Sequence, residues 1–431
     1  MKRTWVQGGG LLFVSVAASC VALDWNFEGS AASSGNGASS SGNAGGGGSS
    51  TSSSSGITTA SGSSSVTSGD GGAGTAASTS SISASSSGSG GASGCPVAGM
   101  VECVGLCVDL TIDGSNCGAC GHSCQGQSCA DSICTPVALA SGLNTPWGLA
   151  VDSASIYWLS TNTPLVAKMP IGGSPNPSPV AAGANTLPGN LQGIALLGLD
   201  VFWTDYAGKA VRTAPVSGSG PTVDIFYPKV EPYSIAINAS AVYWTDALGT
   251  IKRGSLKGGA SPTTIGSNPP GLYAIVAEGA DVYWTTPDGV GQTLADGTGV
   301  AGALVSGQIA PSALAVDATY VYWTSRTAGK VMKAPRLGGP PIEVASGQLC
   351  PGGIAVDADA VYWLTGTAEP SQNVCTGNAV MKYPKASVPG AMPVKLAAAA
   401  GDPGSIALDA NSVYWEVPGT GVDGFILRTS K

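Results

Sequence analysis

An aromatic residue followed directly by tryptophan recurs along the C-terminal two thirds of this chain. Successive tryptophans of these pairs are 45, 41, 40, 39, 40 and 52 residues apart. A period near 40 residues is typical of a β-propeller blade rather than of a helical repeat or a β-helix rung. The repeat therefore predicts an all-β, seven-bladed propeller. The pairs are Tyr157-Trp158, Phe202-Trp203, Tyr243-Trp244, Tyr283-Trp284, Tyr322-Trp323, Tyr362-Trp363 and Tyr414-Trp415.

Each repeat contains four segments with strand character. An apolar segment such as Gly148–Asp152 comes first, then the aromatic-Trp segment, then a segment that often carries a cation, and then one like Pro341–Gly347. A residue pattern that alternates with a period of two, bounded by Gly or Pro turns, is the signature of a strand, and four strands make one blade. We expect the aromatic residues, each burying roughly 150–250 Å², to form the core rather than a sugar-binding platform. The third-segment cations, expected to be solvated or paired, are Lys168, Arg253, Lys333, Lys382 and Arg428.

The two ends of the repeat region complement each other. The last repeat stops at Lys431, just after its third strand, and Thr135–Gly142 matches the fourth-strand pattern. We expect this N-terminal strand to complete the seventh blade, which would remove the free sheet edges that invite aggregation. The predicted propeller therefore spans residues 135–431.

Two of the repeats carry a longer motif. Tyr243-Trp244-Thr245-Asp246 and Phe202-Trp203-Thr204-Asp205 resemble the YWTD propellers of the low-density lipoprotein receptor family. The other five repeats keep the aromatic pair and lack the Asp. Propellers of that family have six blades, so the resemblance concerns the type of blade. It implies an extracellular binding or scaffolding propeller.

The N-terminus has the features of an export signal. Lys2 and Arg3 precede the apolar run Leu11–Ala18, which is typical of a secretory signal peptide over residues 1–20. Ala17-Ala18-Ser19-Cys20 resembles a bacterial lipobox, although Ala17 stands where Leu is usual. The resemblance implies lipidation of Cys20 and a place in the cell envelope, as an outer-membrane lipoprotein. The alternative is an ordinary signal peptide and a secreted protein.

Residues 21–94 are dominated by Ser, Gly, Ala and Thr. Such a segment cannot bury enough apolar area to offset the entropy lost on ordering. We expect a flexible linker whose root-mean-square reach is on the order of 45 Å.

Eight cysteines occur between residues 95 and 134. Their even number in an exported chain predicts a small disulfide-rich module, in which 105 pairings are open. Zinc is the alternative, because Cys117 and Cys120 have ligand spacing and His122 is nearby. The run Cys107–Cys124 resembles a Cys-rich module of secreted myxobacterial proteins, which implies an extracytoplasmic protein and no particular activity. The eight cysteines are Cys95, Cys103, Cys107, Cys117, Cys120, Cys124, Cys129 and Cys134.

The sixth repeat carries an insertion over Thr365–Asn378. In a propeller the loops from strand 4 to strand 1 and from strand 2 to strand 3 share one face, which places Cys350 and Cys375 together. We expect them to form a disulfide that pins the insertion. Long loops on a rigid scaffold often carry function. The polar candidates for a binding loop are Glu369, Gln372 and Asn373.

The sequence favours a binding or scaffolding protein over an enzyme. The propeller has no histidine, which excludes a Ser-His-acid triad and the histidine that propeller lyases resembling streptogramin-inactivating enzymes need. A metal-dependent lactonase- or lyase-like enzyme using carboxylates, with Ca²⁺ in the axial channel, is the alternative. We expect the recurring acids Asp152, Asp317, Asp357 and Asp409 to cap turns instead of forming such a site.

The partners implied are an extracellular protein or glycan, together with a membrane reached through the lipid anchor. A net charge of −8 without a basic run argues against nucleic acid. No internal stretch has the ~18 apolar residues of a membrane-spanning helix.

Overall fold

The structure is a computed structural model. It describes residues 95, 97–160, 165–174, 176–182, 191–268, 273–369, 374–387, 391–399, 404–419 and 421–431, with the backbone alone for 182, 367–369, 374–378 and 399. The chain is all-β over these residues. None of them forms a helix, and so none forms a helix able to cross a membrane.

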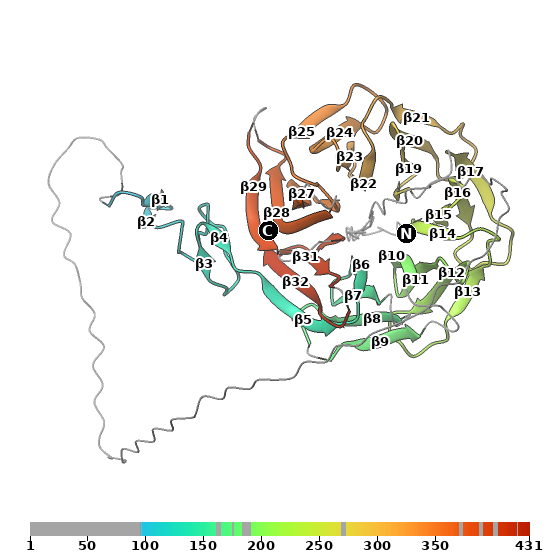
Figure 1. Ribbon diagram of the computed structural model, residues 1–431, viewed down its shortest axis with the longest axis horizontal. Helices are drawn as coiled ribbons and strands as arrows, with labels where there is room; N and C mark the ends of the chain where they lie inside the picture. The colour runs from blue at the N-terminus through green and yellow to red at the C-terminus, as the bar shows by residue number, and fades with distance from the viewer. Residues whose placement is uncertain are drawn as a thin grey trace, which may run out of the picture. The chain divides into compact units, whose positions relative to one another are not determined.

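Seven antiparallel four-stranded sheets surround a central axis (Figure 1), as the repeat predicted. In six of them the strands are hydrogen-bonded in sequence order. Blade 1 is β6 (Pro146–Val151), β7 (Ser155–Ser160), β8 (Leu165–Pro170) and β9 (Ser178–Ala182); blade 2 is β10 (Leu191–Leu197), β11 (Asp200–Asp205), β12 (Ala210–Pro215) and β13 (Val223–Phe226); blade 3 is β14 (Pro232–Ile237), β15 (Val242–Asp246), β16 (Thr250–Gly254) and β17 (Thr263–Ser267). Blade 4 is β18 (Ile275–Glu278), β19 (Asp281–Thr286), β20 (Gly289–Leu294) and β21 (Gly302–Val305); blade 5 is β22 (Pro311–Val316), β23 (Tyr320–Ser325), β24 (Lys330–Pro335) and β25 (Ile342–Ala345); blade 6 is β26 (Ile354–Val356), β27 (Ala360–Glu369), β28 (Val374–Pro384) and β29 (Val394–Ala399).

The seventh blade joins the two ends of the propeller. It consists of β30 (Ile406–Leu408), β31 (Ser412–Val417), β32 (Gly424–Ser430) and the N-terminal strand β5 (Val137–Leu143). β5 pairs antiparallel with β32, with Leu143 opposite Gly424 and Val137 opposite Arg428. The expected ring closure is therefore confirmed, and the closing strand ends one residue later than the sequence pattern indicated.

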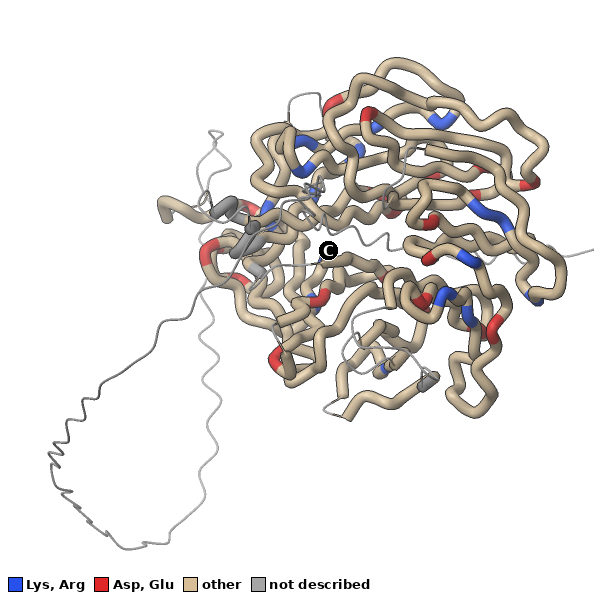
Figure 2. The backbone as a smooth tube through the Cα atoms, turned by 45° about the vertical axis from the view of Figure 1, so that its right-hand side comes forward, with Lys and Arg blue, Asp and Glu red and all other residues tan. Residues whose placement is uncertain are grey.

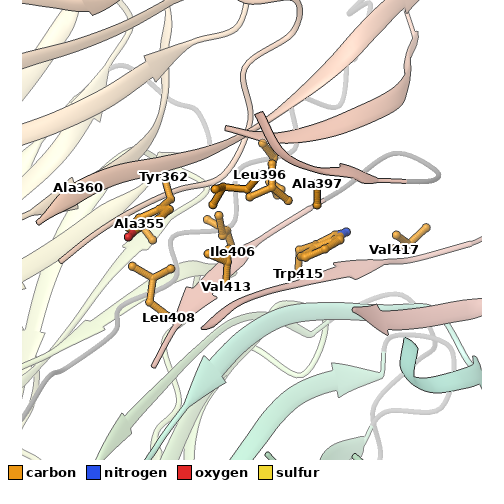
Figure 3. Packing of buried hydrophobic residues seen from close by; sticks show 12 residues of the cluster. Ala355, Ala360, Tyr362, Leu396, Ala397, Ile406, Leu408, Val413, Trp415 and Val417 are labelled. Carbon is orange, nitrogen blue, oxygen red and sulfur yellow. The ribbon is translucent and has the colours of Figure 1, made fainter. Parts of the chain in front are cut away.

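The structure explains why two large aromatic residues stand next to each other in every repeat. Successive side chains of a strand point to opposite faces of its sheet. The first aromatic residue of each pair therefore packs toward the next blade, and the tryptophan packs toward the preceding one. Between blades 6 and 7, for example, Tyr362 and Trp415 share one buried cluster (Figure 3). The same rule holds at the ring closure, where Tyr414 of blade 7 meets Trp158 of blade 1.

Every member of the aromatic ladder is at most 3% exposed, which confirms its role as core. The inner strands also come close together at the axis. A Cβ on Gly193 would lie 2.9 Å from the backbone N of Ile235, and one on Gly353 would lie 2.9 Å from the carbonyl O of Gly404. Since real Cβ atoms are not found that close to backbone, these positions require glycine.

The disulfide-rich module predicted from the sequence precedes the propeller. Its strands are short: β1 (Val101–Cys103) pairs with β2 (Leu106–Val108), and β3 (Cys129–Ala130) pairs with β4 (Ile133–Cys134). The eight cysteines form four disulfides, so neither Cys117 nor Cys120 has a free thiol with which to bind zinc. The disulfides are Cys95–Cys107, Cys103–Cys120, Cys117–Cys129 and Cys124–Cys134.

The C-terminal half of the module contacts blade 7. Gln125 Nε2 donates a hydrogen bond to the carbonyl O of Asn411 at 2.8 Å. His122 is half-buried, with Nδ1 2.5 Å from the carbonyl O of Cys117 and Nε2 3.3 Å from Ser430 Oγ. His122 therefore lies in the contact between module and propeller.

Candidate functional site

The two ends of the ring differ in what their loops contain. We call the end with the strand 4–1 loops and strand 2–3 turns the upper face, and the end with the strand 1–2 and strand 3–4 turns the lower face. Acidic and basic residues are few and interspersed over the blades (Figure 2). Neither sign dominates, so the charge pattern selects neither face as a site.

On the lower face, the recurring aspartates cap the strand 1–2 turns, as expected. Asp317 Oδ1 accepts the backbone N–H groups of Thr319 and Tyr320, both at 2.7 Å, and Oδ2 accepts the Tyr322 hydroxyl at 2.8 Å. The same three kinds of hydrogen bond occur at Asp152, Asp357 and Asp409. Their carboxylate oxygens are thus engaged in turns, which leaves little capacity to coordinate a metal.

Ion pairs connect neighbouring blades on the same face. Each joins a cation at the end of a third strand to the strand 1–2 turn of the preceding blade. Burial opposes ionisation of Asp357, but the Lys431 ammonium and the backbone donors outweigh it and lower the pKa of this carboxyl. These pairs link blades 4 to 7 on the lower face. The pairs are Lys385–Asp317 at 2.6 Å, Lys431–Asp357 at 2.6 Å and Arg336–Asp281 at 2.8 Å.

The third-strand cations face the aromatic ladder. Lys333 lies opposite Tyr322 in the strand register, and Lys382 lies opposite Tyr362. Lys382 Nζ is 5.8 Å from the centroid of the Tyr362 ring, a cation–π distance. Lys168 and Arg253 instead bond to the next blade: Lys168 Nζ donates to the carbonyl O of Val216 at 2.5 Å, and Arg253 Nε donates to that of Ala295 at 2.9 Å. These four cations are therefore paired with neighbouring groups rather than arranged as a ligand ring.

Near the upper face, the residue after each tryptophan contacts the next blade. Thr245 Oγ1 accepts the backbone N–H of Ser234 at 3.2 Å and donates to the carbonyl of Tyr273, ahead of blade 4, at 2.9 Å. Thr204 and Thr324 connect blades 2 to 3 and 5 to 6 in the same way. A hydroxyl at this position satisfies two backbone groups at a blade junction.

Blade 7 has a glutamate, Glu416, at the position that threonine occupies in these blades. Glu416 is fully buried; its Oε1 accepts the backbone N–H of Ser405 at 2.7 Å, and Oε2 accepts the Ser405 hydroxyl at 2.6 Å. The backbone N–H of Gly148, in blade 1, also donates to it. Burial raises the pKa of Glu416 to about 7, although these hydrogen bonds favour the carboxylate. Glu416 was not among the residues predicted from the sequence. It could have been found because a Glu follows the tryptophan where four other repeats have Thr.

The upper face carries an enlarged hairpin on blade 6. β27 and β28 have 10 and 11 residues, whereas β7 and β8 of blade 1 have 6 each. The inserted residues therefore continue both strands instead of forming the long loop expected. The backbone N–H of Gly366 in this hairpin donates to the carbonyl O of Leu349 at 2.9 Å. The hairpin thus begins beside the loop that contains Leu349.

Large apolar side chains are exposed on the loops of the upper face. All five are more than half exposed. They are Tyr227, Leu248, Ile309, Leu349 and Val422. Ile309 and Leu349 occupy the same position in consecutive strand 4–1 loops, before Ala310 and Cys350, whose φ angles of 40° and 44° lie in the left-handed region. Such backbone is costly for non-glycine residues, so these loops have defined shapes.

Of the predicted binding-loop residues, only the backbone of Glu369 is described. The backbone of Glu369 ends β27, while its side chain and all of Gln372 and Asn373 lie outside the described residues. Cys350 is disulfide-bonded. The side chain of Cys375 is not described, so the Cys350–Cys375 pairing stays a prediction, as does lipidation of Cys20.

The described residues contain one group of acids, histidines or cysteines close enough to hold a metal ion, and it consists of cysteines of the module. No carboxylate group of that kind occurs in the described part of the propeller. The Ca²⁺ site left open by the sequence therefore has no support from these residues.

Comparison with known proteins gives a fold and no family. Neither a protein-family model nor a curated protein sequence matches the chain. Two solved structures of virginiamycin B lyase from Staphylococcus aureus are similar, at TM-scores of 0.53 and 0.54 and 12% and 11% identity, covering 66% and 68% of this chain and 95% and 98% of theirs. The second is a catalytically inactive histidine-to-alanine variant with quinupristin. A nidogen/laminin complex matches at a TM-score of 0.42 and 16% identity, over 54% of this chain and 90% of that one, which is too loose an overlay to support an inference.

Proposed function

We propose that this chain is an exported binding or scaffolding protein that recognises an extracellular protein or glycan through the upper face of its propeller. The observation that carries the proposal is the enlarged blade 6 hairpin beside exposed apolar residues on neighbouring loops, Leu349 above all. Exposed apolar side chains on rigid loops are typical of interaction sites. The lower face also exposes apolar residues, such as Leu337 and Met392, but none of its described turns carries a hairpin as long as that of blade 6.

Catalysis receives less support than binding. The similar lyase structures share the propeller fold at 11–12% identity, which by itself transfers no activity. One of them is inactivated by replacing a histidine. The propeller of this chain has no histidine, because His122 lies in the module. A carboxylate-based metal enzyme is the alternative proposal, and a Ca²⁺ titration of the purified protein tests it.

The binding proposal is tested with substitutions on both faces. Purified wild-type protein is presented to immobilised peptidoglycan, exopolysaccharide and an array of extended peptides. For any probe bound, Ile309→Ser and Leu349→Ser should each weaken binding by roughly 10-fold, because a contact residue at the centre of an interface contributes on the order of 1–2 kcal/mol.

Leu337→Ser is the matched control for these variants. Leu337 is an equally apolar, exposed side chain on the opposite face. The control should bind as wild type does. Equal losses for all three variants, or no loss for any of them, would contradict the assignment of the upper face.

We further propose that the protein is held at the cell envelope by lipidated Cys20, with residues 21–94 as the spacer. The disulfide-rich module supports export, because disulfides persist in oxidising compartments. The intact mass of the mature protein should equal a chain starting at Cys20 plus three acyl chains and should contain five disulfides. An unmodified N-terminus at another residue would show a secreted, unanchored protein.

A further inference from the structure

The four inner cysteines of the module share one buried pocket. Cys117, Cys124, Cys129 and Cys134 form a single cluster in which none is more than 8% exposed. They belong to two disulfides, yet the Sγ atoms of Cys117, Cys124 and Cys129 lie within 4.8 Å of one another. The fourth sulfur, of Cys134, is bonded to Cys124 and so adjoins the same group. Three sulfur atoms therefore lie close to one another, and the fourth is bonded to one of them.

The outer two disulfides have a different setting. Cys107 and Cys120 are exposed, each bonded to a partner away from the inner cluster. The Cys117–Cys120 spacing that suggested zinc in the sequence thus joins cysteines of different disulfides. The grouping of sulfur atoms in space is not the one that the sequence spacing indicates.

Four cysteine sulfurs around one point match a structural zinc site. Zn²⁺ binds four thiolates tetrahedrally at about 2.3 Å, which places neighbouring sulfurs about 3.8 Å apart. The sulfur of Cys124 already lies within 4.8 Å of those of Cys117 and Cys129, which belong to the other disulfide. After reduction, the sulfurs of each former disulfide have to rotate apart, and that of Cys134 has to turn toward Cys117 and Cys129.

Contacts with blade 7 would keep the cluster assembled without its disulfides. Gln125, next to Cys124, is hydrogen-bonded to Asn411, and the chain passes from Cys134 into β5 three residues later. Ser430 Oγ lies 3.4 Å from Cys134 Sγ and can donate its hydrogen to that sulfur. A donor of this kind stabilises a metal-bound thiolate.

We propose that reduction of the two inner disulfides turns the module into a Zn²⁺ site whose ligands are Cys117, Cys124, Cys129 and Cys134. Each of the two disulfides takes two electrons and two protons from a dithiol, which itself becomes a disulfide. With a phosphine the two electrons come from phosphorus, and a water molecule supplies the two protons and the oxygen of the phosphine oxide. Either route gives four thiols. Zn²⁺ then displaces four protons to form the tetrathiolate. The module is therefore cross-linked by sulfur–sulfur bonds under oxidising conditions and by the metal under reducing ones. This inference is independent of what the upper face binds.

The test uses the mature full chain, treated with a phosphine reductant under anaerobic conditions and titrated with Zn²⁺ or Co²⁺. We expect one tightly bound metal ion per chain after reduction and none before. Bound Co²⁺ should show the intense visible bands of a tetrahedral thiolate site. Fewer than half an equivalent of metal, or a cobalt spectrum without thiolate charge transfer, would overturn the proposal.

Two double variants locate the site. Cys124→Ser with Cys134→Ser removes two inner ligands and should abolish tight binding by the reduced protein. Cys95→Ser with Cys107→Ser removes an outer disulfide and should leave it unchanged. Tight metal binding that survives in the first variant, through Cys350 for example, would place the site elsewhere. If the first variant does not fold, loss of tight binding in the second variant would still contradict the proposal.

Discussion

A chain that begins at Asn144, and so lacks β5, should fail to form a stable ring. β5 is the outer strand of blade 7, and without it the edge of β32 has no partner. Leu139 and Leu143, which pack in the cluster between blades 7 and 1, would be lost with it. Each buried leucine contributes about 1.5–3 kcal/mol, and exposed strand edges promote aggregation. Tryptophan fluorescence during urea unfolding and size-exclusion chromatography measure both effects.

A second truncation separates closure of the ring from loss of the module. A chain that begins at Thr135 lacks the module but keeps β5. It loses the few hydrogen bonds to blade 7, such as Gln125 to Asn411, each worth about 0.5–1.5 kcal/mol. It should elute without aggregates and unfold at a urea concentration close to that of the full-length chain. Equal unfolding midpoints for the two truncations would show that β5 does not close the ring.

A point substitution avoids the risk of an insoluble truncation. Leu139→Ala should lower the free energy of unfolding by about 2–5 kcal/mol, as expected for a buried leucine. Ser141→Ala, at an exposed position of the same strand, should change it by less than about 0.5 kcal/mol.

The architecture could be read from the sequence because its cause is local and repeated. Adjacent side chains of a strand face opposite ways, so a Tyr-Trp pair in each repeat supplies both neighbouring junctions of a blade. Seven pairs therefore specify seven junctions. The closing strand was equally readable, since the repeat region starts with the strand type that its last repeat lacks.

The parts that escaped prediction depend on contacts between distant residues. The sequence predicted disulfides but left their pairing open, and the fold bonds Cys117 to Cys129 and Cys120 to Cys103. The insertion in blade 6 contains turn-forming residues such as Gly366 and Pro370, which hid its continuation as two strands. The contact of His122 with Ser430 spans more than 300 residues of sequence and left no local signal.

The environment of Glu416 makes the stability of the propeller depend on pH near neutrality. Its pKa is about 7 in the folded protein, against a usual value of 4.5, because burial disfavours the charged form. Below pH 4.5 the group is protonated whether the chain is folded or not, so its contribution to stability is fully present. Between these values the unfolded chain gives up the proton more readily, and stability is lost as pH rises. Above pH 7 the loss is complete.

We therefore expect the free energy of unfolding to fall by about 3 kcal/mol between pH 4.5 and pH 7.5 through this one residue, at 1.36 kcal/mol per pKa unit. Glu416→Gln keeps the shape of the side chain and an oxygen that accepts the Ser405 N–H, but it cannot ionise. Urea unfolding at intervals across this range should show the variant gaining on the wild type as pH rises. Because other titrating groups are the same in both proteins, the difference between the two curves isolates Glu416. Parallel curves would mean that the carboxyl ionises as readily at the blade junction as in water, and that the hydrogen bonds from Ser405 and Gly148 fully offset its burial.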